Sequence, residues 1–231
     1  MRHLELFAGI GGFRRAMDLL TQDHIMDFHC IGYSEIDAKA VKTYCANYHP
    51  EVDGELAMGD IVEFTSNKNN MDNLPQFDLV TGGFPCQTFS MMGKQAGFNE
   101  DRGQMFFHII DILAAKMPRY VLLENVKNLR SHDKGRTFAR IKQELEALGY
   151  QVFTDIFNTA QFHLPQTRNR LLIFATTEPV PADFEVQFTC DNIAVLFDQV
   201  YQDLGTYHYQ SVNDILSLDV DQKYFLSERI K

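Results

Sequence analysis

The segment Leu4-Glu5-Leu6-Phe7-Ala8-Gly9-Ile10-Gly11-Gly12-Phe13 decides how this chain is organised. The apolar stretch 4–7 predicts a short buried strand, and the glycines after it allow a tight turn into a helix. Such a turn lets the backbone approach a ligand closely near the helix start. A purely structural turn is the alternative, and the dinucleotide pattern G-x-G-x-x-G fits poorly because Phe13 and Arg14 follow the third glycine.

Apolar, β-rich segments alternate with helical patterns along the rest of the chain, which is typical of βαβ units around a largely parallel sheet. We therefore predict a doubly wound α/β fold. The polar stretch 65–73 predicts a surface loop, and Gly149 predicts a helix end. The predicted strands are 4–7, 28–33, 77–81, 120–123, 152–157 and 171–176, and the clearest predicted helices are 38–47, 104–116 and 137–148.

The chain has 231 residues, 45% of them hydrophobic, which is enough for one sizeable core. We expect one main domain over residues 1–177 and a tail over 178–231, where Pro179 and Pro181 interrupt the pattern. Four scattered cysteines without a C-x-x-C pair indicate reduced thiols and a cytoplasmic protein. The sequence shows no signal peptide, and no apolar run approaches the roughly 20 residues of a membrane span.

The charge balance is acidic, with 21 Lys and Arg against 31 Asp and Glu and a net charge of −10. Spread evenly, this charge would repel nucleic acid, so it argues against a stand-alone nucleic-acid binder. Added solubility is its commoner meaning.

The run Gly82-Gly83-Phe84-Pro85-Cys86-Gln87 follows a predicted strand and presents Cys86 on a tight turn. We interpret Cys86 as a nucleophile, which needs surroundings that favour the thiolate because a free thiol has a pKa of roughly 8.5. A buried structural cysteine is the alternative. The neighbouring segment 91–101, with Gly93 and Gly97, predicts a mobile lid.

Acidic residues at strand ends indicate a nucleoside pocket. Glu35 can accept hydrogen bonds from ribose hydroxyls, and Asp60 can reach an adenine amine. Taken singly, Glu35 could be a surface carboxylate and Asp60 a turn former.

Glu124 follows an apolar run at the carboxyl end of another predicted strand, where open α/β sheets place their ligands. We expect it to face Cys86 across one cleft and, buried among apolar neighbours, to hold a proton that it can donate. The alternative is a strand-end glutamate in water. Arg168 and Arg170 in the segment 164–170 can bind carbonyl oxygens, phosphates or carboxylates, although an ordinary charged loop would look the same.

In this order, the glycine turn, Glu35, Pro85-Cys86, Glu124-Asn125-Val126 and Gln166-x-Arg168-x-Arg170 resemble the cytosine-5 DNA methyltransferase family. The resemblance covers about residues 1–177, including 93–98 and 101–103. It implies a Rossmann-like S-adenosylmethionine-dependent methyltransferase fold, S-adenosylmethionine as cofactor, no metal, and double-stranded DNA as substrate. A role beside a restriction nuclease is a further implication of the family.

The family also implies roles for single residues. Cys86 would attack C6 of a flipped-out cytosine, Glu124 would hold N3 and the exocyclic amine, and Arg170 would bind O2. Arg168 would support this geometry, while the loop 90–98 closes over the DNA. The implied cofactor contacts are Phe7, Ala8, Gly9, Ile10, Gly11, Gly12, Glu35, Ile36, Asp60, Ile61 and Met105, and the implied DNA contacts are Phe84, Pro85, Gln87, Ser90, Asn125 and Gln166.

The chain departs from the family after residue 177, because it lacks the target-recognition domain and the two later motifs. The segment 211–231, with Tyr224-Phe225-Leu226-Ser227, resembles the approach to that domain. We expect either a catalytic fragment or one subunit of a split enzyme whose partner brings the missing part. The helix that is absent should leave an exposed apolar patch.

Three rival functions remain. A tRNA cytosine-5 methyltransferase would use the same motifs, but Phe84 stands where that branch typically has a second proline. A catalytically silent cofactor-binding subunit is disfavoured because Cys86, Glu124, Arg168 and Arg170 are all present. A nucleotide-dependent oxidoreductase would leave Cys86 and Glu124 without a task.

Overall fold

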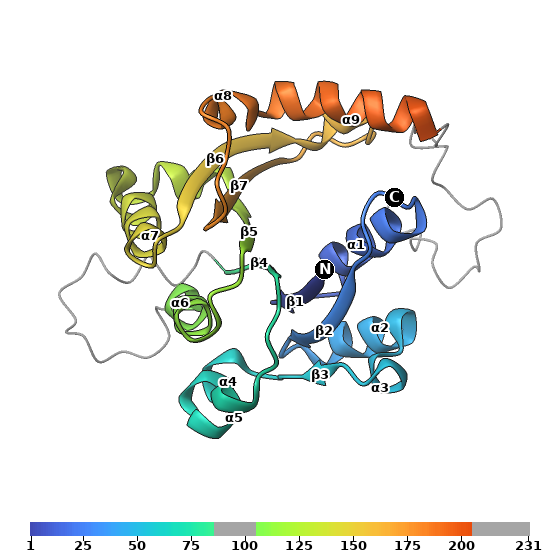
Figure 1. The fold of residues 1–231 in the computed structure, drawn as a ribbon, viewed down its shortest axis with the longest axis vertical. Coiled ribbons are helices and arrows are strands. Elements are labelled where there is room, and N and C mark those ends of the chain that lie inside the picture. Colours follow the sequence, from blue (N-terminus) through green and yellow to red (C-terminus); the bar gives the residue numbers. More distant parts are fainter. Residues whose placement is uncertain (86–104, 205–231) are drawn as a thin grey trace, which may run out of the picture.

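The computed structural model describes residues 1–85 and 105–204, with side chains described up to residue 200. Within these ranges a seven-stranded sheet runs in the order β3-β2-β1-β4-β5-β7-β6 (Figure 1). All neighbouring strands are parallel except β7, which is antiparallel to both β5 and β6. This confirms the predicted doubly wound, mostly parallel fold. The strands are β1 Arg2–Leu6, β2 His29–Ser34, β3 Leu56–Ala57, β4 Leu79–Gly83, β5 Tyr120–Val126, β6 Gln151–Asn158 and β7 Asn169–Thr176.

Helices cover both faces of the sheet. In Figure 1 α4, α5, α6 and α7 lie on one side, and α1, α2, α3, α8 and α9 lie on the other. The helices are α1 Gly12–Gln22, α2 Ala38–Tyr48, α3 Pro50–Asp53, α4 Ile61–Ser66, α5 Lys68–Asn73, α6 Met105–Lys116, α7 Arg136–Ala147, α8 Phe184–Gln187 and α9 Cys190–Leu204. Three short 3-10 turns, η3 Lys127–Arg130, η4 His132–Gly135 and η5 Thr159–Phe162, join the later elements.

The core consists of the inner strands and the buried stripes of α6 and α7. Leu4, Val80 and Val121 are fully buried in adjacent strands, and Ile109 and Ile141 pack on them from α6 and α7. This apolar periodicity is why α2, α6 and α7 were predictable. The chain leaves α7 at Gly149, which has a left-handed φ of 91° and donates its N–H to the carbonyl of Glu146, so the predicted helix end is confirmed.

The predicted loop 65–73 is wrong. It contains the end of α4 and all of α5. The side chain of Asn67 accepts hydrogen bonds from the N–H groups of Asn69 and Asn70 and thereby caps α5. Capping by Asn starts a short helix that its polar composition does not suggest.

Helices α8 and α9 were also not predicted. Phe184 of α8 packs against Phe153 of β6 and Phe174 of β7, and Phe188, the residue directly after α8, packs against Phe174. The division of the chain at residue 177 stays a prediction. Within the described residues, none of the helices has the length and apolar character needed to cross a membrane.

Candidate active site at the carboxyl edge of the sheet

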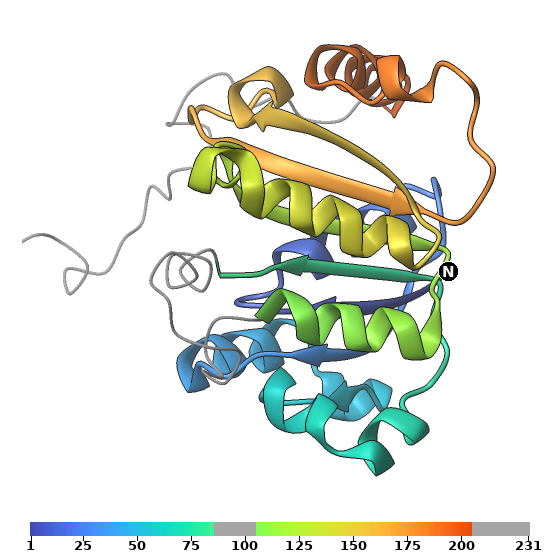
Figure 2. The same ribbon diagram turned by 90° about the vertical axis from the view of Figure 1, so that its left-hand side faces the viewer.

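The predicted site residues gather at one edge of the sheet because parallel strands end there together. The strand order reverses between β1 and β4, and ligands of open α/β sheets bind beside such a switch point. The glycine turn follows β1, Phe84 and Pro85 follow β4, and Glu35 follows β2. In Figure 2 this carboxyl edge lies on the left.

The glycine turn has an unusual backbone. Phe7, Gly9 and Gly11 have positive φ values of 54°, 57° and 89°. A bulky residue such as Phe7 rarely adopts this region, and strain of this kind clusters at ligand sites. At Gly11 no side chain fits, because a Cβ would lie 2.2 Å from Cε2 of Tyr48. The Tyr48 hydroxyl also donates a hydrogen bond of 2.8 Å to the carbonyl of Gly11.

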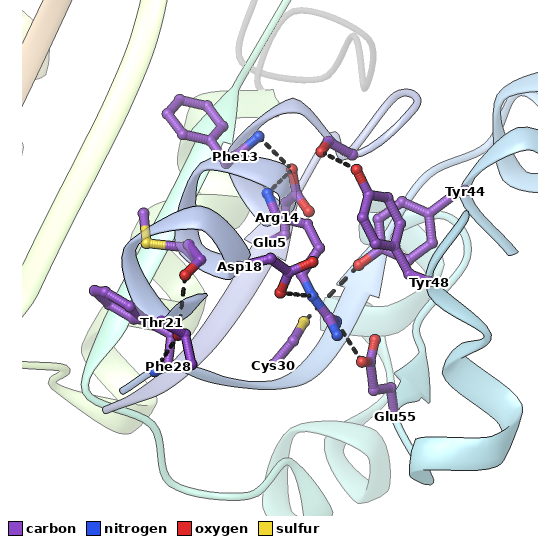
Figure 3. Close-up of polar contacts among 12 residues, drawn as sticks. Glu5, Phe13, Arg14, Asp18, Thr21, Phe28, Cys30, Tyr44, Tyr48 and Glu55 are labelled. Atoms are coloured by element: carbon purple, nitrogen blue, oxygen red, sulfur yellow. Dashed lines mark hydrogen bonds and ion pairs between the residues drawn. The ribbon is translucent and has the colours of Figure 1, made fainter. Parts of the chain in front are cut away.

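A buried carboxylate holds the helix that starts at this turn (Figure 3). Glu5, on β1, is fully buried, and its Oε1 accepts hydrogen bonds from the backbone N–H groups of Phe13 and Arg14 at 3.2 and 3.3 Å. It does the work of an N-cap for α1, since Gly11 at the cap position has no side chain. The other oxygen, Oε2, has no hydrogen-bond partner among the residues that the structure describes. Burial raises the pKa of Glu5 to about 7.

The guanidinium of Arg14 forms its ion pairs with two other carboxylates near Glu5. Its Nε bonds to Asp18 at 2.9 Å, and its Nη1 contacts the buried carboxylate of Glu55. Figure 3 shows Asp18 and Glu55 on either side of this guanidinium. One guanidinium therefore pairs with two carboxylates beneath the glycine turn, and its charge acts on Glu5 only at a distance. The sequence analysis missed this network, although a glutamate between Leu4 and Leu6 in a buried strand was a signal for it.

The nucleoside side of the site combines carboxylates with exposed apolar groups. Glu35 accepts from Gly9 N at 2.8 Å through Oε2 and from the N–H groups of Ile36 and Asp37 through Oε1. Ile36 is 73% exposed and Ile10 is 62% exposed. These apolar side chains on the surface beside Glu35 offer a contact for the flat face of an adenine.

Other implied cofactor residues lie deeper. Asp60 caps α4 by accepting from Val62 N at 2.8 Å. Ile61 is buried in the main core, and Met105 is half-buried against the same core. Ala8 is buried and donates its N–H to the carbonyl of Ser34, while Gly12 begins α1.

The end of β4 lies beside Glu124, just before the predicted nucleophile in the sequence. Gly83 pairs with Glu124 across the β4–β5 ladder, and a Cβ on Gly83 would lie 3.3 Å from Oε2 of Glu124. The side chain of Asn125, which is buried, donates through Nδ2 to the carbonyl of Phe84 at 2.8 Å. Phe84 itself packs in the core against Phe106. The predicted nucleophile Cys86, the residues Gln87 and Ser90 and the predicted lid 91–101 lie outside the described residues.

Glu124 and Arg170 form an ion pair, with Oε1 and Nε 2.6 Å apart. Both side chains are only partly buried, at 26% and 25% exposed. The deep apolar burial expected for Glu124 is therefore absent, and Arg170 occupies the carboxylate. Arg168 and Gln166 are exposed on the preceding loop, where Thr159 bonds to the backbone of both. The structure thus brings Arg170, but not Arg168, to Glu124.

The family model for C-5 cytosine-specific DNA methylases matches residues 1–230. The chain belongs to this family. The Type II methyltransferase M.DsaV of Dactylococcopsis salina is 37% identical over 230 residues, which cover 100% of this chain and 57% of that protein. M.NlaX of Neisseria lactamica is 37% identical, covering 98% of this chain and 63% of that protein. The chain thus spans about half the length of such relatives.

Solved structures show the same fold. The Dnmt2 methyltransferase of S. pombe superposes with a TM-score of 0.69 and 21% sequence identity, over 100% of this chain and 64% of that one. At this identity the likeness concerns the methylase fold alone. The residues that carried the resemblance to the cytosine-5 family are therefore part of a match that extends beyond residue 177.

The methylase chain has an apolar groove beside the Glu124–Arg170 pair, of about 400 Å³. Phe13 of α1 lies on one side and Ile193 of α9 on the other, so the groove opens on the sheet face between these helices (Figure 1). On the sheet the groove is lined by Leu172 together with Glu124 and Arg170. Leu172 is half-buried and alternates along β7 with the fully buried Leu171 and Ile173. Central strands of a doubly wound sheet normally bury both faces. The remaining lining residues are Phe157, Thr159, Phe162 and Leu164.

The three described cysteines have free thiols, and two of them are buried. Burial raises the pKa of Cys30 to about 11 and also raises the pKa of Cys190. Such thiols are poor nucleophiles at neutral pH.

Proposed function

We propose that this chain is the catalytic part of a DNA cytosine-5 methyltransferase that uses S-adenosylmethionine. One observation carries the proposal: the start of the Pro85-Cys86 loop is held by Asn125 directly beside the Glu124–Arg170 pair. A nucleophile, an acid and a cationic oxygen binder are the groups that activation of a cytosine ring requires.

The residues around the glycine turn fit the cofactor. Glu35 offers a carboxylate for ribose hydroxyls, Ile10 and Ile36 offer exposed apolar surface, and Asp60 lies at the start of α4 for the adenine edge. Gly9 and Gly11 keep the turn free of side chains. When bound, S-adenosylmethionine supplies an electrophilic methyl group on its sulfonium.

In the proposed reaction the Cys86 thiolate forms a bond to C6 of the cytosine, and the displaced π electrons make C5 nucleophilic. Glu124 donates a hydrogen bond or proton at N3, and Arg170 binds O2, so both offset the charge that develops on the ring. C5 would then take the methyl group from the sulfonium, leaving S-adenosylhomocysteine. Loss of the C5 proton to a base would return the electrons that break the C6–S bond and restore the Cys86 thiolate.

The ion pair between Glu124 and Arg170 must rearrange for this to happen. The entering base replaces the direct 2.6 Å contact, with Arg170 shifting to O2 and Glu124 to N3 and the exocyclic amine. Before the base arrives, the ion pair balances the two charges and holds both side chains in position. We assign Asn125 to holding the loop, and we keep Phe84, Pro85, Gln87, Ser90 and Gln166 as DNA-side residues and Arg168 as their support.

The groove between α1 and α9 supports a second part of the proposal. We infer that a segment carrying the target-recognition domain and the closing motifs, in a partner subunit, covers the groove. Relatives that are nearly twice as long are consistent with such a part. A chain that is monomeric and fully active on DNA by itself would overturn this. Cytoplasmic location and a role in restriction and modification belong to the same proposal.

The first test is transfer of a labelled methyl group from S-adenosylmethionine to mixed-sequence duplex DNA by the wild-type chain and by Cys86→Ser, with Cys45→Ser as matched control. We expect slow transfer that is lost only in Cys86→Ser, because the isolated chain lacks the proposed partner segment. Transfer by both cysteine variants would overturn the assignment. Transfer to tRNA but not to duplex DNA would favour the rival substrate. Cofactor binding without transfer, measured by calorimetry, would favour the silent subunit.

A further inference from the structure

The segment 127–140 carries an excess of positive charge on an acidic protein. It contains five Lys and Arg residues and one Asp, a net charge of +4. Taking this from the chain's −10 leaves −14 on the other 217 residues. An even spread of charge, which argues against contact with nucleic acid, is therefore not what this chain has.

The segment starts directly after the end of β5, three residues after Glu124. The turns η3 and η4 follow β5 directly, and α7 runs back toward the other edge of the sheet, so the basic segment lies at the carboxyl edge with the candidate active site. Figure 2 shows this stretch at the left, where β4 and β5 also end. A duplex that delivers a base to Glu124 must pass this edge.

All five cationic side chains are exposed: Lys127, Arg130, Lys134, Arg136 and Arg140. The two lysines have no carboxylate within ion-pair distance in the part of the chain that the structure describes. Each of the three arginines has a carboxylate partner that is itself partly exposed. Arg130 lies 3.9 Å from a carboxylate oxygen of Asp155. The other two contact Asp133 and Glu144, which are their neighbours in sequence. Surface pairs of this kind are weak and leave the cations accessible.

The backbone fixes the turn that carries Lys134. Asp133, Lys134 and Gly135 have consecutive left-handed φ values of 50°, 56° and 83°. Each non-glycine residue in this region costs about 1 kcal/mol or more. A hydrogen bond of 2.7 Å between His132 Nδ1 and Thr137 Oγ1 closes the turn. The lysine is therefore presented from a defined turn.

We infer that the segment 127–140 is a contact surface for the phosphates of duplex DNA beside the flipped-out base. The inference rests on the proposed function. It extends that proposal by naming the part of the chain that contacts the backbone of the duplex. Lys and Arg contacts to phosphate position a duplex without reading its sequence, so this surface complements a recognition domain. An isolated charge run is more often a solvated face, but here the charge is concentrated at the catalytic edge of an otherwise acidic chain.

The test compares Lys127→Gln/Lys134→Gln with wild type in binding a fluorescein-labelled duplex, by anisotropy between about 25 and 200 mM salt. Both lysines are exposed and have no ion pair within residues 1–85 and 105–204, so we expect their replacement to leave the fold unchanged. The matched control is Lys68→Gln/Lys116→Gln, with the same change of charge. Lys116 lies just before β5 at the amino edge, where its Nζ donates to a carbonyl of α5, the helix that begins at Lys68.

We expect the Lys127/Lys134 variant to bind the duplex about tenfold more weakly at low salt, with the salt slope reduced by about 2, while the control matches wild type. Equal weakening in both variants, no weakening in either, or no binding by wild type at low salt would overturn the inference. Labelled methyl transfer is measured separately. Wild type that binds duplex through these lysines but shows no Cys86-dependent transfer sinks the proposed function and leaves the contact surface standing.

Discussion

Glu5 shows how one buried side chain can shape both the stability of the fold and its ligand turn. Its pKa is raised from 4.5 to about 7, mainly by burial. Because the folded value is the higher one, the stabilisation is fully present below about pH 4.5 and is lost as the pH rises through about 7. A displacement of this size corresponds to about 3 kcal/mol.

We therefore predict that the free energy of unfolding falls by about 2–3 kcal/mol between pH 4.5 and 8 through Glu5 alone. In Glu5→Gln this part of the pH dependence disappears, since the amide oxygen still accepts from Phe13 and Arg14 but does not ionise. Urea unfolding at several pH values measures it. The exposed Glu51→Gln should keep the wild-type profile, and an unchanged profile in Glu5→Gln would contradict the prediction.

The glycines of the turn predict a graded series. Gly11→Ala should lower stability by more than about 2 kcal/mol, because φ is 89° and the Tyr48 ring occupies the Cβ position. Gly9→Ala should cost about 1 kcal/mol for its φ of 57° alone, and Gly12→Ala, with open space and a helical backbone, should be near neutral. Thermal unfolding measures the order, and S-adenosylmethionine binding by calorimetry should weaken most for Gly11→Ala. A Gly12→Ala as harmful as Gly11→Ala would contradict this account.

At this scale the sequence was informative about the residues of the turn, because glycine and carboxylate spacing is local. It could not reveal the Glu124–Arg170 pair, which joins strands that are distant in sequence. Nor could it reveal that Asn125 donates a hydrogen bond to the carbonyl of Phe84. Both depend on the pairing of β5 with its neighbours.

Among the elements, the ends of β4 and β5 are joined by the hydrogen bond from Asn125 to the carbonyl of Phe84, two residues before Cys86. Asn125→Ala removes the bond to the carbonyl of Phe84 and leaves that buried acceptor without its partner, at a cost of about 1–3 kcal/mol. We predict that kcat for methyl transfer falls more than tenfold while S-adenosylmethionine affinity stays near wild type. The affinity is spared because the glycine turn follows β1, whereas Asn125 and Phe84 lie at the ends of β5 and β4. The exposed Asn128→Ala is the control. Equal loss of kcat and of cofactor affinity would mean that Asn125 acts on the whole fold.

Elements with strong apolar periodicity were predictable, and the others were not. α6 and α7 repeat buried residues at helical spacing and α2 repeats apolar ones, whereas α5 depends on the cap at Asn67 and α9 on the packing of Phe197 against Phe162 of η5. The two-residue strand β3 has too few residues for any pattern. Short elements are fixed by tertiary contacts, and a single sequence does not display those contacts.

On the scale of the whole molecule, the net charge and the average hydrophobic content do not reveal two surfaces of different chemistry at one edge of the sheet. The segment 127–140 is basic and exposed, and the groove between α1 and α9 is apolar and open. The two surfaces flank the Glu124–Arg170 pair. A duplex on the basic surface and a protein segment in the groove would enclose the candidate active site from two sides, which excludes water from the reacting base.

The open groove can be tested on the isolated chain with the dye ANS, which binds exposed apolar surface. We predict that Ile193→Gln, in the groove wall, lowers ANS fluorescence by about half. Val195→Gln on the same helix should leave it near wild type, because Val195 is exposed but does not line the groove. Both changes lie at the surface and should alter stability by less than about 0.5 kcal/mol. If Val195→Gln lowers the signal as much as Ile193→Gln, or the chain binds no dye, the groove is not the open apolar surface of this protein, and the proposed partner segment has no place to bind.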